Sequence, residues 1–191
     1  MTRNRLEAFS DGVIAIIITI MVLELRAPHE ANLAALKPLV PVFLSYVMSF
    51  VYIGIYWSNH HHLLHAVEHV NGRILWANLH LLFWLSLVPF VTAWMGENHF
   101  AGIPVAVYGL VLLLASIAYF VLTRTLISVH GRDSKLANAV GRDFKGQIST
   151  GIYLIAAPLA LMKPLLAAAL YVLVAIMWLV PDRRIEKTLN Q

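Results

Sequence analysis

Three polar residues that could form a hydrogen-bonded network, Arg5, Ser10 and Asp11, lie at the start of a long apolar run. An ionisable group at membrane depth is costly and normally faces protein or water, so Asp11 needs a partner. Arg5 has the complementary charge, but the two are not neighbours on one helix, so a contact between them would run through another helix or subunit. Ser10 can both donate and accept a hydrogen bond. The pattern indicates a contact that fixes helix packing, a direct part in transport, or both.

A second polar group is the histidine-rich stretch NHHHLLHAVEH. His61, His65 and His69 follow one another at intervals of four residues, which would place imidazole ligands for zinc or another transition metal on one helix face. Along a straight helix, however, the first and last are about 12 Å apart, too far to share one ion without a ligand from another segment. We therefore expect an interfacial cluster and no metal cofactor, with a metal site as the alternative. The chain has no cysteine, which excludes disulfides and thiolate chemistry.

These polar residues stand in a very apolar chain. Of its 191 residues, 60% are hydrophobic and 13% are charged, and the mean hydropathy is +0.74. This composition lies far outside that of soluble domains and predicts an all-α membrane protein. The net charge of +4 comes from basic residues spread over loops and termini, so we expect no nucleic-acid partner.

Apolar runs of roughly 17 to 25 residues, the length that crosses a hydrocarbon core of about 30 Å, predict six transmembrane helices in a single domain over residues 1–191. Their approximate ranges are 7–25, 38–59, 74–95, 103–124, 146–162 and 164–181. All but three of the 14 Lys and Arg residues then lie on the side of the N-terminus. Because positive charge collects in cytoplasmic loops, we expect a multi-pass protein with both termini in the cytoplasm.

The first span has an apolar stripe on one side when it is projected as a helix. The members of the stripe are Arg5, Phe9, Val13, Ile16, Ile20 and Leu23. Thr19 lies at its edge, whereas Ser10 and Asp11 project elsewhere. The spacing is close to that of a heptad seam, so ordinary packing against other helices is one interpretation of this face.

Arg5, Phe9, Ser10 and Asp11 form the pattern R-x-x-x-F-S-D, which resembles the signature of the transmembrane protein 175 family of potassium channels. Two further segments resemble bacterial members of that family, namely YWSNHH at residues 56–61 and NLHLLFWLSLVPFVTAW at residues 78–94. The plan of six spans is similar as well, so the resemblance covers nearly the whole chain. By the family pattern, His60 or His61 would contact Ser10 or Asp11 and help to hold the first helix in place.

The resemblance implies a homotetramer in which four copies of the first helix line a central pore. Ile16, Ile20 and Leu23 would form apolar rings that constrict it. The hydroxyl of Thr19 would favour potassium by replacing part of the water shell of the ion. No TVGYG segment is present, so we expect only modest selectivity for potassium over sodium. A single six-span repeat is expected in a prokaryotic plasma membrane.

We therefore expect a channel in the lipid bilayer that conducts potassium and other monovalent cations passively, without a cofactor, and that is not an enzyme. A secondary transporter is one alternative, although it would need midplane charges, broken helices and an internal repeat. A metal-binding membrane protein that uses the histidines is another. An enzyme would need convergent acid, base or nucleophilic groups, which the sequence does not indicate.

Overall fold

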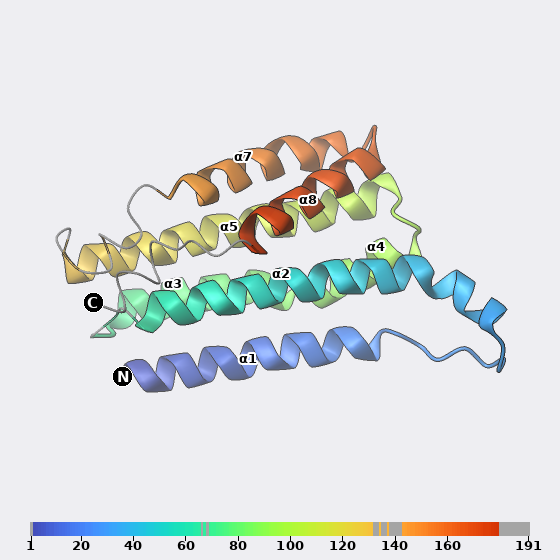
Figure 1. Ribbon diagram of the computed structural model, residues 1–191. Coiled ribbons are helices and arrows are strands. Elements are labelled where there is room, and N and C mark those ends of the chain that lie inside the picture. Colours follow the sequence, from blue (N-terminus) through green and yellow to red (C-terminus); the bar gives the residue numbers. More distant parts are fainter. Residues whose placement is uncertain are drawn as a thin grey trace.

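The computed structural model describes residues 2–65, 67, 69–131, 134, 137 and 143–179. The described helices lie side by side in one elongated bundle, and α1 forms one edge of it (Figure 1). They are α1 (Arg3–Leu23), the 3-10 helix η1 (Leu33–Leu39), α2 (Val40–His65), α3 (Gly72–Ser86), α4 (Val88–Glu97), α5 (Gly102–His130), α7 (Phe144–Leu159) and α8 (Pro164–Leu179).

Among the residues that the structure describes, four helical stretches are long and apolar enough to cross a membrane. They are Arg3–Leu23, Leu33–His65, Gly72–Glu97 and Gly102–His130. α7 and α8 have 16 residues each and therefore extend about 24 Å. The prediction of a helical membrane protein is confirmed at this level.

Two of the helices run beyond their predicted ends. α2 continues to His65 and α5 to His130, where the sequence analysis placed ends at residues 59 and 124. The extra turns contain the buried side chains of Leu63, Leu64 and Leu126. Because these side chains add apolar packing, each helix continues into a region that its polar residues had marked as a loop.

The third predicted span is divided into α3 and α4 at Leu87. Pro89 causes the break, since it has no backbone N–H and its ring clashes with the helical carbonyl four residues before it. Pro164 has a different effect because it is the first residue of α8, where a helix needs no N–H donor.

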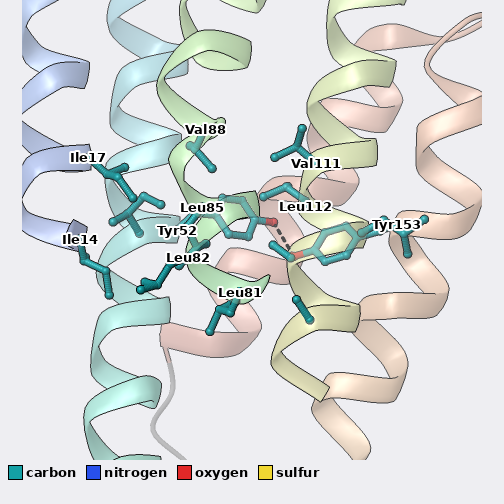
Figure 2. Packing of buried hydrophobic residues seen from close by; sticks show 14 of the residues in the cluster. Ile14, Ile17, Tyr52, Leu81, Leu82, Leu85, Val88, Val111, Leu112 and Tyr153 are labelled. Carbon is teal, nitrogen blue, oxygen red and sulfur yellow. Dashed lines mark hydrogen bonds between the residues drawn. The ribbon is translucent and has the colours of Figure 1, made fainter. Parts of the chain in front are cut away.

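Buried hydroxyl groups connect α2 to the other helices. Thr92 of α4 donates a hydrogen bond to Ser49 of α2 over 2.7 Å. Tyr153 of α7 donates to the hydroxyl of Tyr52 on α2 over 3.1 Å (Figure 2). Tyr52 in turn donates to the backbone carbonyl of Tyr171 on α8 over 2.6 Å. α2 is thus fixed to α4, α7 and α8 while its other side contacts α1.

Candidate functional site on the first helix

α1 has two different faces. Its buried side chains, spaced three or four residues apart, are Leu6, Ser10, Ile14, Ile17 and Met21. The large apolar side chains on its exposed side include Phe9, Ile16, Ile20 and Leu23, with exposed fractions of 50%, 58%, 43% and 77%. The exposed face therefore carries most of the predicted stripe.

Thr19 lies on the exposed face of α1 as well. Its hydroxyl donates a hydrogen bond to the backbone carbonyl of Ile16 over 2.9 Å. Because this bond uses the hydroxyl proton, the oxygen can still offer its lone pairs to a ligand on that face.

The exposed face borders a groove between α1 and α4. Ile16 and Ile20 line it from α1, and Phe90 lines it from α4. Charged side chains, Glu24 and Glu97 among them, line it where the two helices end. This groove leaves the side chains of Ile16 and Ile20 accessible from outside the chain.

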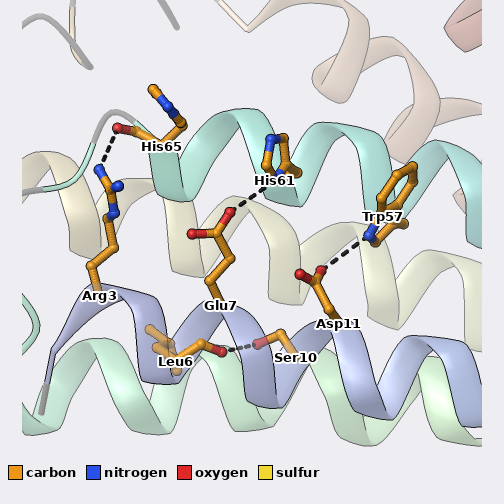
Figure 3. Close-up of polar contacts among 8 residues, drawn as sticks. All are labelled: Arg3, Leu6, Glu7, Ser10, Asp11, Trp57, His61 and His65. Carbon is orange, nitrogen blue, oxygen red and sulfur yellow. Dashed lines mark hydrogen bonds and ion pairs between the residues drawn. The ribbon is translucent and has the colours of Figure 1, made fainter.

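Two carboxylates of α1 bind side chains of α2. The Oδ1 atom of Asp11 accepts a hydrogen bond from Nε1 of Trp57 over 3.0 Å. One turn earlier, Oε1 of Glu7 lies 2.8 Å from Nδ1 of His61 (Figure 3). Both acidic groups thus have a partner on the neighbouring helix of the same chain.

A third contact continues this row. Nη1 of Arg3 donates to the backbone carbonyl of His65 over 3.1 Å (Figure 3). The three α1 residues are four apart in the sequence, and so are their three α2 partners in the reverse order. We call this row of contacts the α1–α2 ladder; it fixes the register of two antiparallel helices.

A buried group behind the ladder joins α1, α2 and α3. The amide of Asn78 donates to Oγ of Ser10 over 2.9 Å, and Ser10 donates to the carbonyl of Leu6 over 2.9 Å. The Oδ1 atom of Asn78 lies 2.7 Å from Nε2 of His60. Since that amide oxygen can only accept, Nε2 of His60 is assigned the proton.

The predicted motif residues are therefore divided between several contacts. Ser10 and His60 meet through Asn78, Asp11 binds Trp57, and His61 binds Glu7 rather than Ser10 or Asp11. Arg5 and Phe9 are exposed on the far side of α1. The sequence analysis did not identify the roles of Asn78, Trp57 or Glu7. The matching four-residue spacings in the two helices were the signal that could have found the ladder.

The three histidines of the metal-site alternative do not share a helix. His61 and His65 lie on α2, with ring centroids 6.2 Å apart, but α2 ends at His65 and His69 follows it. Over the residues that the structure describes, no group of three or more His, Asp or Glu side chains is placed to hold a metal ion. The geometry that motivated this alternative is therefore not formed.

Comparisons with known proteins identify relatives of the whole chain. The family described as "Endosomal/lysosomal potassium channel TMEM175" matches residues 5–89. A protein of Chryseobacterium sp. (strain P1-3) named as a potassium channel is 54% identical over 191 residues and covers 100% of both chains. One from Streptomyces collinus, also named as a potassium channel, is 32% identical and spans 88% of this chain and 90% of its own.

A solved structure has the same arrangement of helices. It is the crystal structure of a protein titled a lysosomal potassium-selective channel TMEM175 homolog from Chamaesiphon minutus, and it superposes with a TM-score of 0.81 at 28% identity. The match covers 93% of this chain and 96% of the other. Sequence and structure therefore agree that this chain belongs to the TMEM175 family.

Proposed function

We propose that this protein is a potassium-permeable cation channel and that four copies assemble around a central pore lined by α1. The observation that carries the proposal is the exposed apolar face of α1, which holds Ile16, Ile20 and Leu23 in a row. The names of its relatives, which describe potassium channels, give the permeant ion.

One chain cannot enclose a pore with one helix face, so the proposal requires an oligomer with closed symmetry. The groove between α1 and α4 offers a place where a helix of the neighbouring subunit would pack against Phe90. Such packing would turn the exposed faces of the four α1 helices toward a common axis.

Around that axis, Ile16, Ile20 and Leu23 would form three apolar rings. Narrow apolar rings oppose the passage of hydrated ions and can close a pore by excluding water. Thr19 would add a ring of hydroxyl oxygens, each able to replace part of the hydration shell of potassium. Selectivity for potassium over sodium would be modest because the pore has no set of carbonyl oxygens like that of a TVGYG filter.

The polar contacts of α1 support this function without touching the ion. The α1–α2 ladder and the group around Asn78 lie on the sides of the helix that face the bundle. They would hold each pore helix in one position and orientation so that the apolar rings align. Both termini would be cytoplasmic in a prokaryotic plasma membrane, as the distribution of Lys and Arg indicates.

Ion flux into liposomes tests the proposal. The purified full-length protein is reconstituted, and fluxes of potassium, sodium and protons are measured separately under matched gradients. We expect potassium to enter faster than sodium, and Ile16→Asn to raise the flux and reduce the preference because an amide hydrates the constriction. Leu154→Asn is the matched control, since Leu154 is 64% exposed on α7 and Ile16 is 58% exposed on α1.

If the two asparagine variants change the ion flux equally, α1 does not line the pore. A protein that moves no cation under any gradient would contradict the channel itself. If only protons cross, the pore conducts protons and not potassium.

A further inference from the structure

A cavity of about 300 Å³ lies between α2, α5 and α7, and the end of α8 closes part of it. Its lining includes Tyr56 from α2, Phe120 from α5, Tyr153 from α7 and Trp178 from α8. α1 lies at the other edge of the bundle (Figure 1). The cavity is therefore separate from the proposed pore lining.

The walls offer little to a polar ligand because most of their polar side chains already form hydrogen bonds within the protein. Ser116 of α5 and Thr150 of α7 share a hydrogen bond of 2.7 Å. The indole nitrogen of Trp178 donates to Ser149 over 2.8 Å. An ordered water needs two to four polar partners, and an empty apolar space loses dispersion contacts, so an apolar occupant fits these walls best.

The length of the cavity matches one leaflet of a bilayer. Along α7 the lining runs from Asp143, at the start of the helix, to Tyr153, a rise of about 15 Å. The hydrocarbon layer of one leaflet is half of about 30 Å. An acyl chain that enters at the membrane surface would thus fit inside the cavity through the whole hydrocarbon layer of one leaflet.

The rim provides an opening, and charged side chains of both signs lie near it. Ile117 and Phe120 line the cavity from α5 and are 39% and 40% exposed, and Gln147 at the start of α7 is exposed as well. The ammonium group of Lys145 lies 5.9 Å from the ring centroid of Trp178. A cation at this level attracts the phosphate of a phospholipid head group. The carboxylate of Asp143, which lines the same end, accepts a hydrogen bond from the backbone N–H of Gly146 over 2.9 Å.

From the fit of the walls, the length and the position of Lys145, we propose that this cavity binds one acyl chain of a phospholipid, with the lipid phosphate beside Lys145. The bound chain would fill the space between α2 and α7 and join the outer helices to the bundle. The site is independent of the proposed pore and of ion conduction.

Native mass spectrometry of the full-length protein in detergent tests this assignment. The delipidated protein is titrated with phosphatidylglycerol, phosphatidylethanolamine or oleate, and the retained molecules per chain are counted. The rim variant carries the two substitutions Ile117→Phe and Gln147→Phe, which narrow the opening at two exposed residues. Leu154→Phe/Ile155→Phe is the control, with two exposed residues of α7 outside the lining.

We expect the wild type and the control to retain one phosphatidylglycerol per chain. The rim variant should bind it about tenfold more weakly, and Lys145→Gln about fivefold more weakly. At one phosphatidylglycerol concentration, the melting temperature in detergent should rise less in the rim variant than in the wild type. Equal retention by the rim variant and the control, or retention of oleate but not of the phospholipid, would overturn the proposal.

Discussion

Asn78 joins three helices because a single amide can donate and accept at once. Its nitrogen donates to Ser10 on α1, and its oxygen accepts from His60 on α2. All three side chains are buried, so the loss of one partner leaves a polar atom without the hydrogen bond that offsets its burial.

Ser10→Ala should lower the free energy of unfolding by about 1–3 kcal/mol, because the amide of Asn78 loses its acceptor in a buried site. Thermal unfolding in detergent measures the effect. Ser86→Ala is the control, since Ser86 is exposed and bonds only to the carbonyl of Phe83, one turn earlier in its own helix. Similar melting temperatures for the two variants would contradict the role assigned to Asn78.

The contact between Asp11 and Trp57 can be isolated by a double-mutant cycle. Asp11→Ala and Trp57→Phe each remove one side of a 3.0 Å hydrogen bond. Their effects on stability should be less than additive by about 1 kcal/mol, because the second substitution has no bond left to remove. Asp11→Asn should retain most of the stability, since an amide oxygen also accepts from the indole. Strict additivity would show that the two residues act independently.

At the scale of elements, α2 and α4 approach closely at Gly96, which lies against the hydroxyl of Ser45 and the backbone of Val42. A Cβ built there would lie 2.7 Å from Cα of Val42, and a backbone atom cannot rotate away as the end of a side chain can. The small residue therefore allows the two helices to approach closely and brings α4 toward α1.

Gly96→Ala should destabilise the protein by about 1–3 kcal/mol, since the helices must separate to admit the methyl group. Gly54→Ala is the matched control in α2, where nothing lies within 4 Å of the added carbon. It should be neutral or stabilising by up to about 1 kcal/mol because alanine is the better helix former. In detergent, the melting temperature should therefore fall for Gly96→Ala and stay the same or rise for Gly54→Ala. An equal fall in both variants would contradict the close packing.

For the whole molecule, the cysteine-free sequence permits a direct test of assembly. Leu23→Cys places one thiol at a position that is 77% exposed, and Met21→Cys places one that is 1% exposed. If four α1 helices surround a pore, a short bis-maleimide should cross-link the first variant between subunits and leave the second monomeric on a denaturing gel. If Leu23→Cys does not cross-link in membranes, the exposed faces of α1 in different subunits do not lie close together.

The sequence predicted the properties that depend on one helix at a time. Hydropathy located the helices, and the projection of the first span gave its apolar stripe. The break before Pro89 was not predicted, because hydropathy does not report the effect of proline on helix geometry. Contacts between helices were harder, because hydropathy carries no information on antiparallel register. The sequence analysis therefore connected neither Asn78 to Ser10 nor Trp57 to Asp11.

The α1–α2 ladder also restricts how α1 can move. If α1 slid along α2 by one turn, about 5.4 Å, in one direction, Glu7 would face the backbone carbonyl of His65, so two oxygen atoms would oppose each other. In the opposite direction, Arg3 would face His61, which now lies opposite the carboxylate of Glu7. Either translation would leave one favourable contact in place of three, Asp11 with His61 in the first case and Glu7 with Trp57 in the second. α1 and α2 should therefore travel as one rigid body. A spectroscopic label on the histidine-bearing end of α2 would then report a displacement of the first helix.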